Sequence, residues 1–191
     1  TALLAGDALL THAFALLATS YAAQPALANA LTRELADAAG SRRLIGGQME
    51  DLLAERKSDA TNDELEFIHL NKTAAMIETA LVMGGLVGGH STSSGQGASE
   101  ADLATLRRAG RHLGLAFQIV DDILDATADT ATLGKTAGKD AKAGKTTFVK
   151  LHGLEASRRF AMEHTKAAAG AFMQLSVNTD FLTALVGSMA T

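Results

Sequence analysis

The sequence predicts an all-α protein that forms a single helical domain over residues 1–191. Hydrophobic residues make up 47% of the chain and charged residues only 20%, and the single proline leaves long stretches free to be helical. Alanine and leucine are abundant in those stretches, where apolar positions recur at helical spacing. A chain of 191 residues is long enough for one substantial core and too short to favour two ordinary domains.

The first helix is expected over residues 3–17, and apolar side chains lie on nearly all of its sides. Only Asp7 and His12 interrupt that apolar surface. A helix that is hydrophobic all round is typical of the interior of a bundle, so we expect this one to be buried. The pattern breaks around 21–25, which contains the proline, and a second helix is expected over 26–39.

Five more helices are expected in the rest of the chain, separated by segments rich in glycine, serine or threonine. Asn62 or Asp63 is expected to cap the fourth helix of the chain. Ser99 and Asp102 resemble a capping box at the start of the fifth. The expected ranges are 45–57, 62 to the glycine cluster 84–89, 99–126, 148–169 and 180–189, with loops over 90–99 and 127–147.

The segment FQIVDDILD, residues 117–125, carries three carboxylates near the end of the fifth helix. Successive residues of a helix turn by about 100°, so Asp121, Asp122 and Asp125 project toward one small region. Carboxylates held that close repel one another, and the residues between them offer no cation. Mg²⁺ suits such a site because it accepts a few carboxylates and keeps its other positions for water and phosphate oxygens.

An isolated DDxxD pattern is more often a solvated helix face than a metal site. Here the positions between the acids are large and apolar, which favours a cleft lined by the protein core. We therefore interpret this segment as one wall of a metal site.

A lysine-rich segment follows the acidic helix, although the net charge of the protein is −4. Its glycines allow the backbone to approach a ligand, and its threonines add hydroxyl donors. Such a loop alone is more often solvated surface. Beside the carboxylates it predicts a diphosphate site, in which metals neutralise the inner charge and lysines bind the outer oxygens. The lysines are Lys135, Lys139, Lys142, Lys145 and Lys150, and the segment holds one acid, Asp140.

Two further pairs of polar residues lie in the N-terminal half. Lys72 and Thr73 interrupt an apolar helical stretch, so Lys72 either extends along a core face to water or points at an anion in the cleft. Gln48 and Asp51 share a helix face. The pair fits a polar network and an ordinary helix surface equally well. The histidines show no pairing at zinc-ligand spacing, so we interpret them as structural or exposed.

Bulk properties exclude several classes of protein. The net charge of −4 gives no positive field that would attract nucleic acid or an anionic membrane. The absence of cysteine excludes disulfides and thiolate catalysis, and it fits the reducing cytoplasm. The sequence contains no run of about 20 uninterrupted apolar residues, so stable insertion into a membrane is not predicted. The chain begins without methionine and already within a helical pattern, so we expect the natural protein to extend upstream of Thr1.

Taken together, these segments resemble the trans-polyprenyl diphosphate synthases, the family of farnesyl and geranylgeranyl diphosphate synthases. The match runs in order across nearly the whole chain, which is far more specific than a lone DDxxD. The matching segments are Gly6-Asp7 with Leu9-Leu10, Gly46-Gly47-Gln48 with Asp51, Lys72-Thr73, FQIVDDILD, and GKTAGKD through GKTTF at 134–148.

The resemblance implies an isoprenoid-synthase-type helical bundle whose cavity holds an allylic diphosphate between two aspartate-rich motifs through Mg²⁺. It implies a prenyltransferase that ionises the allylic diphosphate and condenses it with isopentenyl diphosphate in short-chain trans-polyprenyl synthesis. It also implies a homodimer.

The resemblance further implies a role for individual residues. Asp121, Asp122 and Asp125 correspond to metal ligands, with Asp121 the foremost. Lys72, Thr73, Gln118 and Lys135 correspond to catalytic groups, and together with Lys145 they bind the allylic diphosphate. Gln48, Asp51 and Asp140 correspond to polar groups that support the metal site without binding the metal.

The sequence departs from the family pattern in one respect. The first aspartate-rich motif and most groups that bind isopentenyl diphosphate belong upstream of Thr1, so the domain is expected to lack its N-terminal helices. We therefore expect the 191 residues alone to be inactive.

Two alternative functions remain open. The first is a non-catalytic partner subunit of a heteromeric synthase, although the intact Asp121 and Lys72 argue against it. The second is a class I terpene cyclase, whose second metal motif usually mixes Asn, Ser or Thr with acids, unlike FQIVDDILD.

Overall fold

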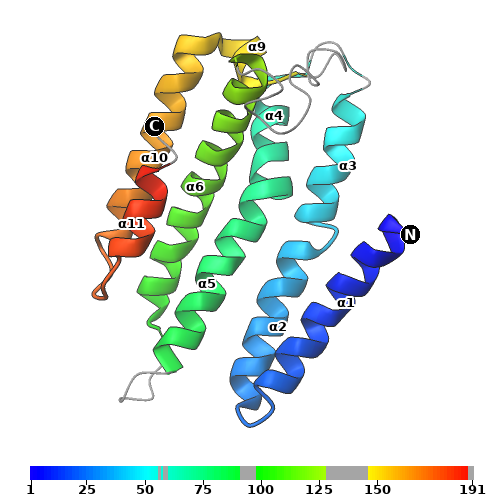
Figure 1. Ribbon diagram of the computed structural model, residues 1–191, viewed down its shortest axis with the longest axis vertical. Coiled ribbons are helices and arrows are strands. Elements are labelled where there is room, and N and C mark those ends of the chain that lie inside the picture. The colour runs from blue at the N-terminus through cyan, green and yellow to red at the C-terminus, as the bar shows by residue number, and fades with distance from the viewer. Residues whose placement is uncertain (56, 58–59, 91–97, 128–145, 189–191) are drawn as a thin grey trace.

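The computed structural model describes residues 1–55, 57, 60–90, 98–127 and 146–188, and every regular element within these ranges is a helix. The all-α prediction is confirmed. The elements, labelled as in Figure 1, are α1 (Ala2–Ser20), α2 (Pro25–Ala39), α3 (Leu44–Ala54), α4 (Asn62–Ile68), the π-helix η1 (His69–Ala74), α5 (Ala75–His90), α6 (Glu100–Thr127), α9 (Phe148–His152), α10 (Leu154–Phe172) and α11 (Asp180–Gly187).

The long helices stand side by side. Figure 1 shows α10, α6, α5 and α2 in that order across the molecule, and each neighbouring pair is in contact. The elements α4, η1 and α5 follow one another without a break and form a single column, against which α3 packs at η1. This arrangement brings α3, η1 and the C-terminal half of α6 together at one end of the bundle.

The helix starts show which expected caps form. Ser99 and Asp102 make the expected capping contact, because Ser99 Oγ accepts the Asp102 backbone N–H at 3.1 Å. At α4 the expectation was wrong, since Thr61 is the cap rather than Asn62 or Asp63. Thr61 Oγ1 accepts the Glu64 N–H, and the Glu64 carboxylate accepts the Thr61 N–H. Each of the two backbone N–H groups therefore has a side-chain acceptor.

The helix expected over 148–169 is two helices instead. Gly153 ends α9 and precedes α10 with φ of +78°, a conformation that residues with a Cβ atom rarely adopt. The glycine redirects the chain, and α10 then packs along α6.

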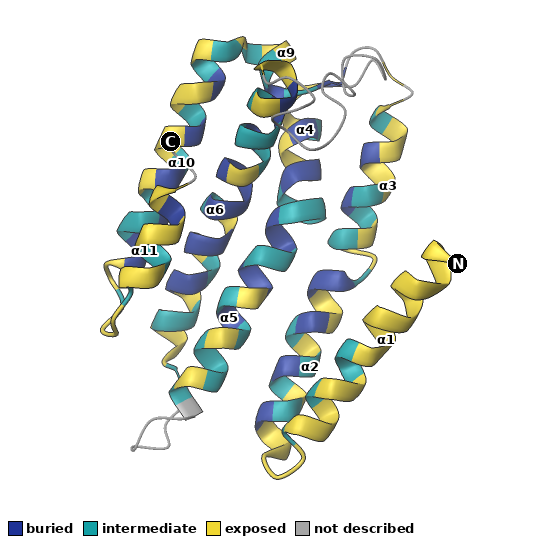
Figure 2. Ribbon diagram, viewed as in Figure 1, coloured by how far each residue is buried: buried dark blue, intermediate teal, exposed yellow. Residues whose placement is uncertain are grey.

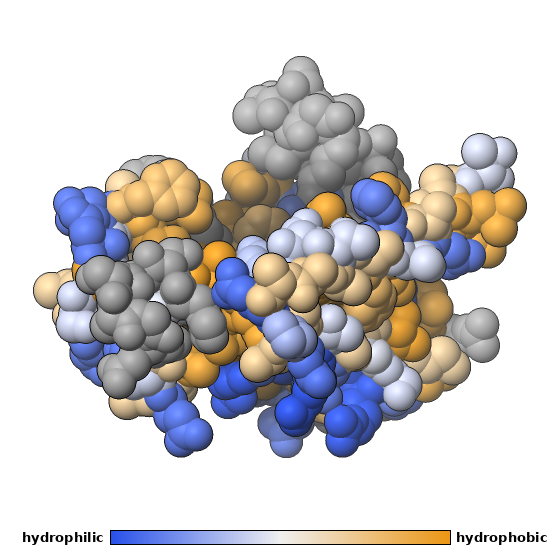
Figure 3. All heavy atoms as spheres, turned by 90° about the horizontal axis from the view of Figure 1, so that it is seen from below, coloured by the Kyte–Doolittle hydropathy of each residue, from blue (hydrophilic) through white to orange (hydrophobic). Residues whose placement is uncertain are grey.

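The expectation that the first helix is buried was wrong. No residue of α1 is buried, and Leu3 and Leu9 are 79% and 71% exposed. Figure 2 shows α1 mostly in the colour of exposed residues, and Figure 3 shows apolar side chains on the surface where α1 lies. A helix that is apolar all round needs partners on all sides, and within the described chain α1 packs mainly against α2.

The helix α1 also meets the length and hydropathy criteria of a membrane-crossing segment. The sequence had predicted no such segment, because Asp7 and His12 interrupt the apolar run. The two criteria concern length and composition only, and they are also met by core helices of soluble proteins.

Two glycines of α6 bring its backbone close to the α4–η1–α5 column. A Cβ atom added at Gly110 would overlap the backbone of Glu78, and one added at Gly114 would overlap Ala74 Cα and Cβ. Ala74, Gly110 and Gly114 are all buried. Glycine at these two positions therefore sets the spacing and register between the column and α6.

We predict that Gly114→Ala destabilises the protein by about 1–3 kcal/mol, because the added methyl overlaps backbone atoms and forces the helices apart. This loss should outweigh the gain of about 1 kcal/mol that alanine has over glycine within a helix. Urea denaturation followed by circular dichroism measures the change. The matched control is Gly170→Ala in α10, where an added Cβ meets no atom within 4 Å. Equal effects of the two substitutions would contradict the close contact at Gly114.

A histidine pair joins α6 to α10. His112 Nδ1 and His164 Nδ1 lie 3.0 Å apart, although the residues are 52 positions apart in the sequence. Burial lowers the pKa of His112, and the charge of Arg108 lowers it further. Burial and the neighbouring His112 lower the pKa of His164, against the opposing charges of Glu66 and Glu163. The folded protein therefore favours the neutral form of both rings.

This pair predicts a pH dependence of stability. Because both pKa values lie below the 6.5 of an unperturbed histidine, the unfolded chain takes up protons first as the pH falls. The contribution of the pair is complete above about pH 6.5 and is lost as the pH falls below that value toward the lower pKa values of the folded state. The urea midpoint should therefore decrease from about pH 7 to about pH 5, and H164Q should flatten that decrease. H12Q on the exposed α1 should leave it unchanged, and an unaltered slope in H164Q would refute the assignment.

Candidate active site

Lys72 and Thr73 lie on the π-helix η1, in the middle of the continuous column. Adjacent residues of a helix point in directions about 100° apart, so the two side chains reach different neighbouring helices. Lys72 faces Asp51 of α3, and Thr73 faces Gln118 of α6. Single π turns within α-helices occur frequently at functional sites.

Lys72 forms an ion pair with Asp51. The Asp51 side chain is 4% exposed and that of Lys72 31%, so the pair extends from the interior toward the surface. Gly47 makes the pairing possible, because a Cβ atom there would overlap the backbone of Lys72. The Lys72 ammonium pairs with the buried Asp51 carboxylate, a partner that neither of the two alternatives stated for Lys72 had included. Gln48 lies on the same helix as Asp51 and is half-buried.

Thr73 begins a chain of hydrogen bonds that crosses to α6. Thr73 Oγ1 donates to Gln118 Oε1 at 3.1 Å, and Gln118 Nε2 contacts Asp122 Oδ1 at 3.4 Å. Asp122 Oδ2 accepts the backbone N–H of Phe148 at 2.9 Å. The chain thus connects η1, α6 and the first residue of α9.

The three aspartates of the acidic segment have different surroundings. Asp122 is buried and accepts from Gln118 and the Phe148 amide, so it fixes the start of α9 to α6. Asp125 is also buried, whereas Asp121 is half-buried one helical turn before it. Within the described ranges, no three His, Cys, Asp or Glu side chains gather closely enough to hold a metal ion.

The donor set nevertheless suits Mg²⁺. Asp121 and Asp125 are four residues apart on α6 and present hard oxygen atoms on one helix face. Mg²⁺ is commonly held by one or two carboxylates together with water and substrate phosphates. Asp121 and Asp125 could therefore supply part of a metal coordination sphere, and Asp122 stays a predicted ligand whose Oδ2 also accepts the Phe148 N–H.

The lysine-rich segment falls largely outside the described residues. Lys135, Lys139, Asp140, Lys142 and Lys145 lie there, and their assigned roles stay predictions. Of the residues that follow, Thr147 caps α9 through its hydroxyl, which accepts the Lys150 N–H at 3.2 Å, and Lys150 is exposed. Thr146 is buried, and its hydroxyl has no hydrogen-bond partner among the described residues.

Sequence reasoning missed two features of this region. One is the contact between Asp122 and the Phe148 amide, for which the sequence carries no local signal because the residues are 26 positions apart. The other is Glu78, which is 1% exposed and pairs with Arg43, Arg107 and Arg111. A single acid in an otherwise apolar helical run was the signal for it.

The Asp122 contact gives a prediction that separates it from Asp121. D122A should lower the free energy of unfolding by about 1–3 kcal/mol, because the buried Phe148 N–H loses its acceptor. D122N keeps one carbonyl acceptor, so its free energy of unfolding should decrease less. D121A alters a half-buried carboxylate and should show the smallest decrease. Urea denaturation measures all three variants. A loss in D121A as large as that in D122A would contradict the structural role of Asp122.

Comparisons with known proteins give consistent results. The family model described as Polyprenyl synthetase matches residues 1–175. The chain is 48% identical over 162 residues to geranylgeranyl pyrophosphate synthase 7, chloroplastic, of Arabidopsis thaliana, covering 84% of this chain and 44% of that protein. It is 44% identical over 170 residues to geranylgeranyl pyrophosphate synthase, chloroplastic, of Catharanthus roseus, covering 87% of this chain and 45% of that protein. The matched residues thus cover less than half the length of these relatives.

Solved structures show the same similarity in the fold. A geranyltransferase from Helicobacter pylori, complexed with magnesium and isoprenyl diphosphate, superposes with a TM-score of 0.79 at 30% identity, over 97% of this chain and 58% of that one. A polyprenyl synthetase from Streptomyces coelicolor superposes with a TM-score of 0.84 at 25% identity, over 98% of this chain and 66% of that one.

Proposed function

The chain belongs to the polyprenyl synthetase family, and from this we propose that it forms the diphosphate-binding part of a prenyltransferase that condenses isopentenyl diphosphate with an allylic diphosphate. The observation that carries the proposal is a pair of polar assemblies that start from adjacent residues of η1, one of which reaches the acidic end of α6. These are the ion pair Lys72–Asp51 and the hydrogen-bonded chain from Thr73 through Gln118 to Asp122. Asp121 and Asp125 follow Gln118 on the same helix.

In the proposed reaction, the allylic C–O bond breaks and leaves an allylic cation and diphosphate. The double bond of isopentenyl diphosphate attacks the cation, and loss of a proton gives a product longer by one isoprene unit. Asp121, Asp122 and Asp125 would hold Mg²⁺, which as a Lewis acid would neutralise charge on the departing diphosphate.

The remaining residues of this chain bind and orient the diphosphate. Lys72 supplies a positive charge whose position is fixed by the buried Asp51. Gln118 is oriented by Thr73 and Asp122, so its amide is held beside the acidic residues. Lys135 and Lys145 remain proposed ligands of the outer phosphate oxygens, and Gln48 and Asp140 remain proposed supporting groups.

Location and assembly are proposals of the same kind. Relatives named as chloroplastic support a plastid location in place of the cytoplasm expected from the sequence. The exposed apolar surface of α1 supports a contact with a second subunit, as in the expected homodimer. The relatives reported above are named as synthases, which does not favour the cyclase or the non-catalytic subunit.

Calorimetry of inorganic diphosphate binding in the presence of Mg²⁺ tests the proposed site. Loss of a charged ligand worth about 1.5–3 kcal/mol weakens binding about 10- to 100-fold, and we expect a change of this size in D121A. D63A, which alters an exposed carboxylate at the start of α4, should bind as the unaltered chain does. Unchanged affinity in D121A would refute the metal-site assignment.

Turnover is expected to require more than these 191 residues, because the printed sequence contains the DDxxD pattern once and the proposed metal cage needs two aspartate-rich motifs. The chain alone should therefore bind diphosphate without forming product from the two substrates. Product formation by the chain alone would contradict this expectation.

A further inference from the structure

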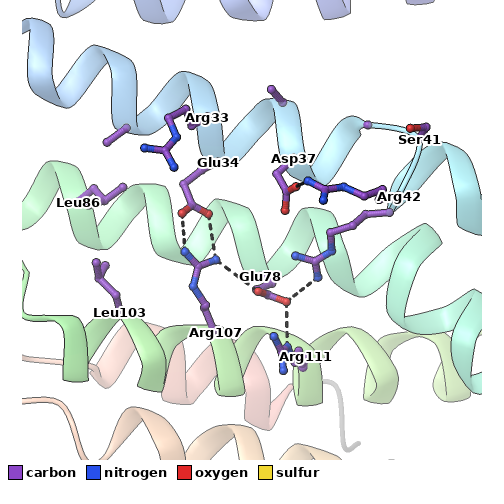
Figure 4. A pocket seen from close by; sticks show the side chains of 14 residues that line it. Arg33, Glu34, Asp37, Ser41, Arg42, Glu78, Leu86, Leu103, Arg107 and Arg111 are labelled. Atoms are coloured by element: carbon purple, nitrogen blue, oxygen red, sulfur yellow. Dashed lines mark hydrogen bonds and ion pairs between the residues drawn. The ribbon is translucent and has the colours of Figure 1, made fainter.

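A groove of about 890 Å³ lies between α2, α5 and α6. Figure 4 shows its charged side chains converging from these helices and from the segment that joins α2 to α3. Lys72, Thr73, Gln118 and Asp121 do not line it. We call it the arginine groove, after the five arginines among its lining residues: Arg33, Arg42, Arg43, Arg107 and Arg111.

Glu78 of α5 organises the floor of the groove. Its Oε2 accepts from Arg43 Nη2 at 2.7 Å and from Arg111 Nε at 3.1 Å, and its Oε1 lies 3.4 Å from Arg107 Nη1. Burial opposes the charge of Glu78, but the hydrogen bonds of Arg43 and Arg111 outweigh it and hold the pKa of this carboxyl below its usual value. Glu78 therefore stays ionised and fixes three guanidinium groups in place.

The groove carries more positive than negative charge. Its three carboxylates are Glu34, Asp37 and Glu78, so the five arginines leave an excess of two positive charges in a protein whose net charge is −4. This excess matches the charge of one phosphate dianion. A local field of this sign attracts anions although the protein as a whole repels them.

Several guanidinium donors remain available for a ligand. The only described ion pair of Arg111 is formed by its Nε, which leaves both Nη atoms, and its side chain is 56% exposed. The only described ion pair of Arg42 joins one Nη to Asp37, and its side chain is 86% exposed. Guanidinium forks match phosphate oxygens in geometry as well as in charge. In Figure 4 these two arginines lie toward the same end of the groove as Arg43.

Two leucines lie at the opposite end of the groove. Figure 4 shows Leu86 and Leu103 far from Arg42, with Arg33 beside Leu86. A ligand with a charged head and an apolar tail would find a suitable surface for each part.

We propose that the arginine groove binds a phosphoryl group at Arg42, Arg43 and Arg111, either as free phosphate or as the head of an organic phosphate whose tail lies against Leu86 and Leu103. The site involves no metal. It is therefore independent of the proposed Mg²⁺–diphosphate site, and failure of one assignment leaves the other standing.

Calorimetric titration with inorganic phosphate, in EDTA and without Mg²⁺, tests the proposal. The unaltered chain should bind one phosphate. R42Q/R111Q should weaken binding at least about tenfold for each arginine–phosphate pair that is lost. R158Q/R159Q in α10 is the matched control, because both arginines are exposed and Arg158 pairs with Glu155 as Arg42 pairs with Asp37. It removes the same charge and should bind phosphate as the unaltered chain does.

R111K keeps the proposal testable if the double variant does not fold. It retains a positive charge beside Glu78 but loses the planar fork, so it should fold and bind phosphate more weakly. Titration with octyl phosphate separates the two sources of the ligand. Tighter binding than that of inorganic phosphate assigns an organic phosphate, and equal binding assigns free phosphate.

Three results would overturn the proposal. One is the absence of phosphate binding by the unaltered chain at millimolar concentration. Another is an equal loss of affinity in R42Q/R111Q and R158Q/R159Q, which would indicate unspecific attraction. The third is loss of binding in K72M with retention in R42Q/R111Q, which would place the phosphate at the candidate active site.

Discussion

The contact of α6 with the α4–η1–α5 column at Gly110 and Gly114 determines the geometry on which the rest of the structure depends. Because neither glycine has a side chain, the two backbones approach closely, and their register cannot shift without overlap. In that register Thr73 reaches Gln118, and Glu78 reaches Arg111. A single packing constraint therefore sets both the polar chain of the candidate active site and the floor of the arginine groove.

Periodicity along the sequence predicted most helices, because the spacing of apolar residues is a local property. The errors concern partners that lie elsewhere in the chain. The sequence shows that α1 is apolar on all sides but not which surface covers it, and its burial was therefore predicted wrongly. Helical spacing also does not reveal the Phe148 amide that donates to Asp122, and the assignment of Asp122 as a metal ligand stays a prediction. The sequence pattern singled out Lys72 without deciding its role, and the roles predicted for Lys72 and Gln118 came from the family resemblance.

Adjacent aspartates of the acidic segment have different surroundings. Asp122 faces the start of α9, and hydrogen bonds from protein groups stabilise its charge. Asp121 lies on another side of α6 and is half-buried. The donors on Gln118 and Phe148 thus offset part of the repulsion that the neighbouring carboxylates exert on Asp122.

The π-helix has a consequence for how mutations in the column should be interpreted. A π turn adds one residue to the helical repeat, so the side chains before His69 and those after Ala74 follow two different angular phases. No single helical wheel describes residues 62–90. Deleting one residue within η1 would bring both halves into one phase, and it would rotate Leu65 relative to Glu78 by about 100°. The column could then satisfy its contacts with Phe148 or those with Arg111, but not both at once.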